Sequence, residues 1–141
     1  MAGEIDFVFF DIGGTLGERD VMGHFTPFPS SAGLLRAMRE QLGVRIGVIT
    51  TLVSLTNDDA LALLSGAGLA DFLAPGALVS EHDAGAAKPS PAIYRFAAQR
   101  VGVPVDRCLY VGENLVEVIG AMAAGMKAVL KPSPPGRELR N

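Results

Sequence analysis

Short apolar runs alternate with longer amphipathic segments along the chain. The runs at residues 5–10, 44–50, 107–111 and 127–130 are rich in β-branched, aromatic and other apolar residues, and a weaker run lies at 77–80. Uninterrupted apolar runs of this length are typical of strands that are buried on both faces of a parallel sheet. The pattern therefore predicts five strands.

The segments between these runs carry helix signals. Apolar residues recur at helical spacing over residues 30–42, behind a pair of serines that could cap the helix. Thr56 and Asp59 have the spacing of a capping box at the start of a second helix. Pro91 suits the first turn of a third helix, and a fourth is predicted over residues 114–125.

Strands and helices thus alternate with short connections. This predicts the α/β class: a three-layer Rossmann-like domain with a mostly parallel five-stranded sheet and helices on both faces. Right-handed crossovers bring the carboxyl ends of the strands to one edge, where ligands bind beside the reversal in strand order. Residues 18–29 are polar, contain Gly and Pro, and predict a loop or small flap. One domain is expected over residues 1–131, followed by a Pro-rich tail at 132–141.

Composition limits the classes of function. About half of the 141 residues are hydrophobic, the formal net charge is -3, and Lys and Arg are scattered, so no nucleic-acid-binding surface is indicated. No apolar run is long enough to span a membrane, and the single cysteine, Cys108, cannot form an internal disulfide. We expect a cytoplasmic protein in which Cys108 is an inert thiol.

Polar residues stand at the ends of the predicted strands. Asp11 follows the first strand, Thr50 ends the second, Lys88 precedes a helix, and Glu113 and Glu117 follow the fourth strand. Each residue alone has an ordinary explanation as a turn, cap or solvated side chain. Together at one sheet edge they supply a carboxylate nucleophile, a hydroxyl, a cation and further carboxylates, which metal-assisted attack on a phosphate requires.

The same positions belong to an ordered set of motifs that resembles the haloacid dehalogenase superfamily of phosphohydrolases. The motifs are FFDIGGTL at 9–16, VIT at 48–50, KPSP at 88–91, and YVGE at 110–113 with GA at 120–121 and AGM at 124–126. The resemblance covers residues 5–130 and includes all four family motifs in order.

This resemblance implies a role for each polar residue. Asp11 would attack phosphorus to form an aspartyl-phosphate. Thr50 would donate a hydrogen bond to a phosphoryl oxygen, and Lys88 would neutralise charge on both the nucleophile and the phosphate. Gly14 is expected beside the phosphate as well.

The resemblance also implies Mg²⁺ as the cofactor. One oxygen of Asp11 and the carbonyl of Gly13 would bind the ion. Glu113 and Glu117 match the positions of the family's metal-binding carboxylates, and either could be the ligand. Hard oxygen donors of this kind suit Mg²⁺.

Two departures from the family pattern affect the expected activity. Gly13 stands where the phosphatases usually carry a second Asp, which protonates the leaving group and then activates water. General acid–base catalysis typically raises the reaction rate about a hundredfold to ten-thousandfold. A slow enzyme is therefore expected unless Glu18, Asp20 or His24 in the flap takes over this role. Glu113 replaces the usual Asp, and its longer side chain is expected to alter metal affinity.

The connections leave no room for the cap domain that many family members insert. An open site predicts a large phosphorylated substrate, such as a phosphoprotein or a nucleic-acid end, or a partner subunit that closes the site in a homo-oligomer. Small phosphate esters are the alternative.

The leading hypothesis is a slow Mg²⁺-dependent phosphomonoester hydrolase. One alternative is a degenerate member that binds a phosphorylated ligand or partner with little turnover, and another is a 2-haloacid dehalogenase. A signalling receiver domain fits poorly, because its phosphorylated Asp follows the third strand.

Overall fold

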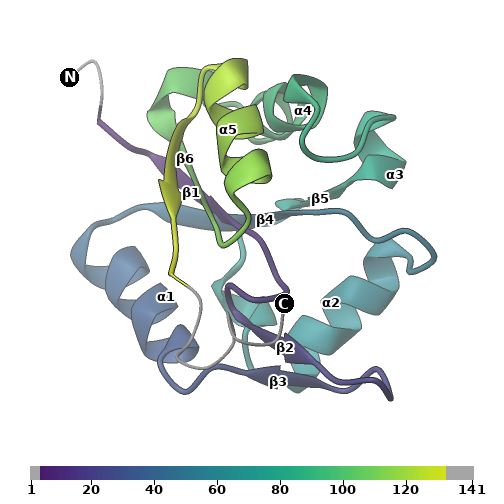
Figure 1. Ribbon diagram of the computed structural model, residues 1–141. Helices are drawn as coiled ribbons and strands as arrows, with labels where there is room; N and C mark the ends of the chain where they lie inside the picture. The colour runs from purple at the N-terminus through teal and green to yellow at the C-terminus, as the bar shows by residue number, and fades with distance from the viewer. Residues whose placement is uncertain (1–3, 133–141) are drawn as a thin grey trace.

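The computed structural model describes residues 4–132 as a three-layer α/β unit (Figure 1). Its main sheet has the order β5-β4-β1-β6-β7, and every neighbouring pair is parallel. The strands are β1 (Phe7–Phe10), β4 (Arg45–Thr50), β5 (Leu78–Ser80), β6 (Cys108–Gly112) and β7 (Lys127–Leu130). The predicted fold class is confirmed.

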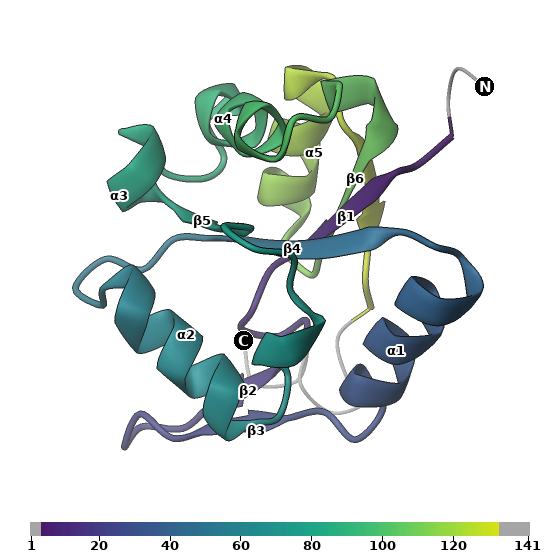
Figure 2. The ribbon, with the colours of Figure 1, turned by 180° about the vertical axis from the view of Figure 1, so that it is seen from behind.

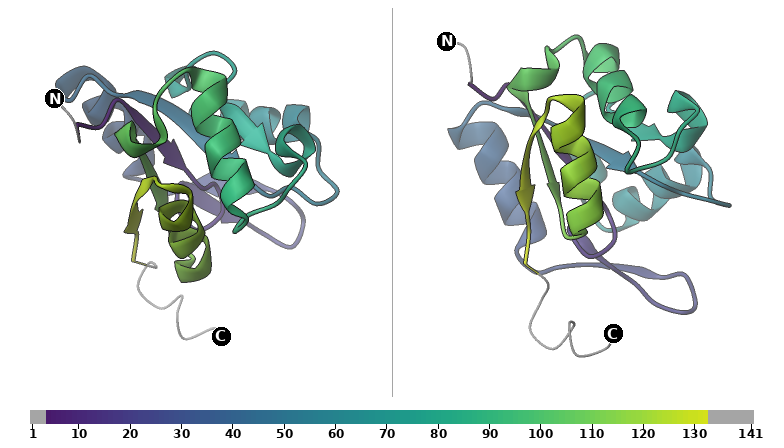
Figure 3. Two further views of the ribbon diagram at one scale, coloured as in Figure 1. Left: turned by 90° about the horizontal axis from the view of Figure 1, so that it is seen from above. Right: turned by 45° about the horizontal axis from the view of Figure 1, so that its top comes forward.

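Helices cover both faces of this sheet. One face carries α1 (Ser31–Gln41) and α2 (Asn57–Gly66), and the other carries α3 (Glu81–Ala84), α4 (Pro91–Val101) and α5 (Leu115–Ala124) (Figure 2). On the second face α4 and α5 pack side by side (Figure 3). Two short 3₁₀ helices, η1 (Ala70–Phe72) and η2 (Val105–Arg107), complete the described elements.

The central strand β1 contributes to both hydrophobic cores. Phe7 and Phe9 are buried on the α4–α5 side, whereas Val8 and Phe10 are buried on the α1–α2 side. This alternation follows from the two-residue period of a strand and explains why β1 is apolar throughout. The strand order reverses at β1, so the residue that follows it, Asp11, lies at the switch point where open α/β sheets bind ligands.

The segment predicted to be a loop or small flap at residues 18–29 contains most of a short antiparallel hairpin. It consists of β2 (Gly17–Arg19) and β3 (Phe25–Pro27). The Asp20 carboxylate closes the turn, since its Oδ1 accepts the amides of Met22 and His24 at 2.9 Å each. Strands of three residues are too short to produce a periodic pattern, so these two strands could not be predicted from hydrophobic periodicity.

The helix starts agree with the sequence except at α1. The capping box of Thr56 and Asp59 and the cap by Asn114 are both present. Ser30 occupies the N-cap position of α1 but makes no capping hydrogen bond. The Ser31 hydroxyl donates to the Leu16 carbonyl at 2.7 Å instead, and thereby ties α1 to the loop after β1. The expected serine cap was therefore wrong.

Two expectations concern the chain as a whole. The predicted tail at residues 132–141 lies outside the described residues except for Pro132. Within residues 4–132, no helix combines the length and apolar character needed to cross a membrane.

Candidate active site

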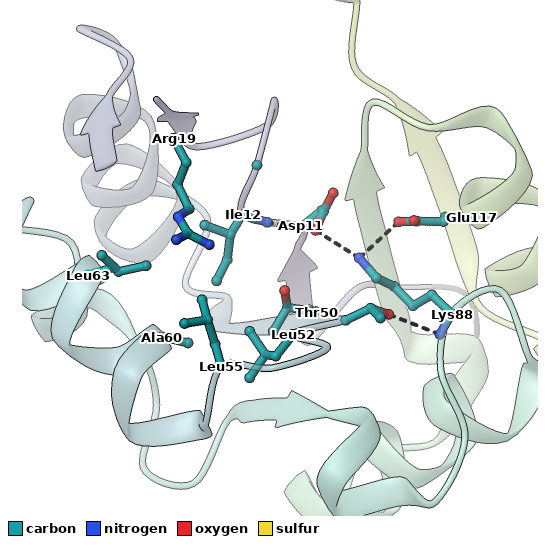
Figure 4. A pocket seen from close by; sticks show the side chains of 12 residues that line it. Asp11, Ile12, Arg19, Thr50, Leu52, Leu55, Ala60, Leu63, Lys88 and Glu117 are labelled. Atoms are coloured by element: carbon teal, nitrogen blue, oxygen red, sulfur yellow. Dashed lines mark hydrogen bonds and ion pairs between the residues drawn. The ribbon is translucent and has the colours of Figure 1, made fainter. Parts of the chain in front are cut away.

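Asp11 is held at the carboxyl end of β1. Its amide donates to the Val111 carbonyl at 3.0 Å, which continues the pairing of β1 with β6 by one residue. Its Oδ1 accepts the Ile12 amide and the Lys88 ammonium, each at 2.8 Å (Figure 4). The side chain is 15% exposed, so the carboxylate is largely desolvated but still reachable from the cavity.

Lys88 is the electrostatic centre of the site. Its Nζ lies 2.8 Å from Oδ1 of Asp11 and 2.9 Å from Oε1 of Glu117 (Figure 4), and it donates to the Tyr110 hydroxyl at 3.1 Å. The side chain is only 2% exposed. Burial raises the pKa of Asp11 above its ordinary value, and the neighbouring Lys88 opposes that rise. The ammonium therefore helps to keep the Asp11 carboxylate ionised.

Close packing of α5 against the loop before α4 brings Lys88 to Glu117. Gly120 lies directly against Pro89, and a Cβ at Gly120 would collide with the Pro89 carbonyl. The Tyr94 hydroxyl of α4 donates to the Glu117 carbonyl at 2.7 Å. The Lys88–Pro89 peptide is cis. Gly120 is thus required by the close approach of two segments that carry site residues.

The Tyr110 hydroxyl contacts both Lys88 and Glu117. This buried group receives the Lys88 hydrogen bond and donates to Oε1 of Glu117 at 3.2 Å. Burial raises the pKa of Tyr110, so the phenol remains a neutral donor. Gly112, two residues along β6, is also constrained, because a Cβ there would press on the Tyr110 ring.

Thr50 and the loop after it form the opposite wall. Thr50 ends β4, is 5% exposed and lines the cavity, where its hydroxyl faces inward (Figure 4). The next residue, Thr51, accepts the Lys88 backbone amide through its hydroxyl at 3.3 Å. This bond connects the loop after β4 with the loop that carries the cation.

Glu81, the first residue of α3, holds the same loop in place. Its carboxylate accepts the amides of Leu52 at 2.8 Å and Val53 at 2.8 Å. Burial raises the pKa of Glu81, but these amide hydrogen bonds outweigh it and bring the pKa below the ordinary 4.5. Val53 has φ of 58°, a left-handed conformation that is strained for a β-branched residue. The carboxylate therefore stabilises an otherwise unfavourable turn.

The cavity has a volume of about 280 Å³ and is lined by five of the predicted residues: Asp11, Gly13, Thr50, Lys88 and Glu117. Glu113 and Gly14 are not among the lining residues, and the Gly14 amide donates to the Gly17 carbonyl at 2.8 Å. The complete lining is Asp11, Ile12, Gly13, Arg19, Thr50, Thr51, Leu52, Leu55, Ala60, Leu63, Lys88 and Glu117.

The hairpin contributes Arg19 to this lining but none of the proposed substitute acids. Asp20 and His24 pair with each other at 3.3 Å, and neither they nor Glu18 line the cavity. Among the described residues, the carboxylates of the lining are those of Asp11 and Glu117 alone. Within residues 4–132, no carboxylate from the hairpin takes the place of the side chain that Gly13 lacks.

The family model for haloacid dehalogenase-like hydrolases matches residues 16–125. The chain belongs to the haloacid dehalogenase-like hydrolases. Phosphatase MT3486 of Mycobacterium tuberculosis is 33% identical over 111 residues, which are 79% of this chain and 49% of that protein. The phosphoglycolate phosphatase of Rhodospirillum rubrum is 32% identical over 125 residues, 83% of this chain and 49% of that protein. The chain thus spans about half the length of these curated relatives.

Solved structures agree with the family assignment. The haloacid dehalogenase-family phosphatase of Thermococcus onnurineus is 27% identical, with a TM-score of 0.66 over 79% of this chain and 49% of that one. The L-2-haloacid dehalogenase of Xanthobacter autotrophicus is 18% identical, with a TM-score of 0.77 over 96% of this chain and 81% of that one. At this identity the second likeness shows the fold alone.

The metal site expected for a haloacid dehalogenase-like hydrolase is sparse in this chain. Within residues 4–132, no group of three or more His, Cys, Asp or Glu side chains is placed to hold an ion. Glu117 is engaged by Lys88 and Tyr110. Oδ2 of Asp11 accepts no hydrogen bond from the described residues and, with the nearby Gly13 backbone, offers oxygen donors. Such a set fits Mg²⁺, which keeps several waters and needs only one or two carboxylates.

Three residues at the site were not assigned a role from the sequence. Tyr110 stands inside a strand, Glu81 follows a weak strand, and Arg19 lies in a segment without periodicity. Tyr110 could have been suspected, because a polar hydroxyl inside an otherwise apolar central strand needs a buried partner. Nothing in the local sequence indicated Glu81 or Arg19.

Proposed function

We propose that this chain hydrolyses phosphate monoesters through an aspartyl-phosphate on Asp11, slowly and with Mg²⁺ as cofactor. The observation that carries the proposal is the 2.8 Å contact between the Lys88 ammonium and the Asp11 carboxylate inside a cavity that Thr50 also lines. In one cavity, a buried cation can bind the oxygens of a phosphoryl dianion while a carboxylate attacks its phosphorus. The named phosphatases among the relatives support the same activity.

In the first step the Asp11 carboxylate attacks phosphorus. A bond forms between a carboxylate oxygen and phosphorus while the bond from phosphorus to the ester oxygen breaks. Lys88 and Thr50 stabilise charge on the phosphoryl oxygens, and one such donor is worth about 3 kcal/mol. The leaving alkoxide takes its proton from water, because Gly13 supplies no acid.

In the second step water attacks the phosphorus of the aspartyl-phosphate. The bond from phosphorus to the Asp11 oxygen breaks, inorganic phosphate leaves and the carboxylate is regenerated. The attacking water has no carboxylate base at position 13, so this step is expected to be slow as well.

Mg²⁺ would be held by Asp11 and the Gly13 carbonyl, with Glu113 or Glu117 as a further ligand. When bound, the ion would neutralise charge on the phosphoryl group. Lys88 already neutralises part of the charge of Asp11 and Glu117, so a bound ion would have less negative charge to balance.

The substrate is a phosphorylated compound that enters from the open side of the cavity. The short connections support the proposal that no cap domain closes over it, so macromolecular phosphoesters or closure by a second subunit remain part of the proposal. The cavity of about 280 Å³ is also large enough to receive the leaving group of a small organic phosphate.

Hydrolysis of p-nitrophenyl phosphate with Mg²⁺ tests the proposal. We expect phosphate release that falls by about a thousandfold or more in Asp11→Asn, because the nucleophile is removed. Asp106→Asn is the matched control, since Asp106 precedes β6 at the opposite edge of the sheet. Turnover that survives in Asp11→Asn would contradict the mechanism.

The missing acid at position 13 favours one second candidate, a protein that binds a phosphorylated ligand with little turnover. The same cavity would then serve as a phosphate receptor. Wild-type protein that binds phosphate but releases none from the ester would support this candidate. A dehalogenase activity is tested separately, by chloride release from 2-chloropropionate.

A further inference from the structure

The cavity has a polar end and an apolar wall. The polar end holds Asp11, Thr50 and Lys88, and the apolar wall is formed mainly by the loop after β4 and by α2. The wall residues are Leu52, Leu55, Ala60 and Leu63, with Ile12 beside them (Figure 4). A phosphoryl group held at the polar end would therefore extend its leaving group along an apolar surface.

Arg19 is the charged residue of the lining that stands apart from Asp11, Lys88 and Glu117. It comes from β2 of the hairpin, and its guanidinium points into the cavity from the side opposite Lys88, with Ile12 between them (Figure 4). The two cations are therefore separated, so one phosphoryl group at Lys88 would leave Arg19 free for another part of the substrate.

Arg19 also differs from the other arginines of the described chain. It makes no hydrogen bond or ion pair with any residue between 4 and 132. The six other described arginines each bond to an oxygen or stack on a ring: Arg36, Arg39, Arg45, Arg95, Arg100 and Arg107. A cavity-lining guanidinium without a partner is suited to an anion from outside the chain.

We propose that Arg19 selects small organic phosphates whose leaving group carries a second negative charge on an apolar body. This rests on the proposed function, because the first anion is the phosphoryl group at Asp11 and Lys88. The guanidinium pairs with the second anion, a carboxylate in the simplest case, and the leucine wall contacts the body between the two. Both the phosphoryl group and the second anion of such a substrate then pair with a cation, whereas an ester with an uncharged leaving group has no use for Arg19.

Two esters of the same shape separate this proposal from phosphate binding alone. Phenyl phosphate and 4-carboxyphenyl phosphate differ only in the second anion. Their dissociation constants are measured by calorimetry on the full chain carrying Asp11→Asn, so that neither ester turns over. The same measurements are made after adding Arg19→Gln or, as the matched control, Arg95→Gln, whose guanidinium lies on α4 away from the cavity.

We expect the Asp11→Asn protein to bind the carboxylated ester about tenfold more tightly, the value of one charge-assisted contact at an exposed arginine. Arg19→Gln should abolish this preference and leave the affinity for phenyl phosphate within about twofold, while Arg95→Gln should change neither. Equal affinities in the parent, or a preference that survives Arg19→Gln, would overturn the role of Arg19 alone. If neither ester binds, the proposed function fails as well.

Discussion

Gly13 occupies the position at which the proposed mechanism lacks a general acid and base. A Cβ at Gly13 would meet no atom within 4 Å, and the residue lines the cavity beside Asp11. A Cβ therefore fits there without displacing its neighbours. We predict that Gly13→Asp raises the rate of p-nitrophenyl phosphate hydrolysis by about a hundredfold, because it supplies the missing general acid and base.

The control for this gain is Gly13→Asn, which has the same shape but cannot transfer a proton. Its steady-state rate should stay near that of the wild type. A gain in both variants would show that volume or polarity, rather than proton transfer, limits the reaction. No gain in Gly13→Asp would indicate that another group already serves as the acid.

Lys88 is expected to stabilise the folded chain in addition to its proposed role in catalysis. It is the ammonium that lies between the carboxylates of Asp11 and Glu117, and its side chain is 2% exposed. We predict that Lys88→Met lowers the free energy of unfolding by about 3 kcal/mol at pH 8, since two partly buried carboxylates lose their counter-charge. Urea unfolding measures the change, and the exposed Lys127→Met should cost less than about 0.5 kcal/mol.

This loss should shrink in acid. Burial raises the pKa of Asp11 above its ordinary 3.8, so the folded protein takes up a proton at a higher pH than the unfolded chain does. Folded Lys88→Met should do so at a still higher pH, because the cation that opposed the rise is gone. The difference in the free energy of unfolding between Lys88→Met and the wild type should therefore become smaller as pH falls toward 4. A difference that does not change with pH would contradict this account.

Site residues were predictable from the sequence where they stand at the end of a predicted strand. Asp11 and Thr50 each close an apolar run, so the sheet topology alone placed them at one edge. Glu117 was predicted as a metal ligand, whereas the structure pairs it with Lys88; its role toward a metal stays a prediction. Arg19 could not be foreseen, because its position depends on how a short hairpin folds back over the cavity.

At the scale of elements, α3 acts on the site although it carries no catalytic residue. Glu81 at its start fixes the loop after β4 through the amides of Leu52 and Val53. We predict that Glu81→Ala raises KM for p-nitrophenyl phosphate several-fold, with a smaller effect on kcat, because the loop that carries Thr51 and follows Thr50 loses its anchor. It should also cost about 1 kcal/mol of stability.

Steady-state kinetics and urea unfolding measure both effects. The exposed Glu40→Ala on α1 removes an equal charge from another face and should change neither quantity. Glu81→Gln keeps an acceptor oxygen, so its KM should lie between the KM of the wild type and that of Glu81→Ala. A fall in kcat with KM unchanged would mean that Glu81 does not act by positioning the loop.

The longer elements were predictable and the shorter ones were not. The helices α2, α4 and α5 have caps that are written in the sequence, such as Thr56 with Asp59. The four-residue α3 has a local capping box of Ser80 with Asp83, but it and the three-residue strands of the hairpin are too short to produce a periodic pattern. Periodicity needs about two turns of helix or four residues of strand before it becomes readable.

At the scale of the whole molecule, one sheet edge collects segments from four parts of the chain. Asp11 follows β1, Thr50 ends β4, Lys88 precedes α4 and Glu117 lies in α5. The strand order explains this convergence, because β1 lies between β4 and β6 and the parallel strands all end on the same side. The convergence of these segments was predictable from right-handed crossovers. The contacts of Lys88 with Asp11, Glu117 and Tyr110 depend on side-chain packing that the sequence pattern does not show.

An ion bound at this edge should stabilise the whole fold, because the folded chain binds it and the unfolded chain does not. We predict that Mg²⁺ at about a hundred times its dissociation constant adds about 2.7 kcal/mol to the free energy of unfolding. For a chain of this length, that raises the thermal midpoint by several degrees. Asp11→Asn should remove most of the shift, and Asp106→Asn at the other edge should retain it. An equal shift in both variants would place the ion elsewhere, since only a ligand at the carboxyl edge makes stabilisation by Mg²⁺ depend on Asp11.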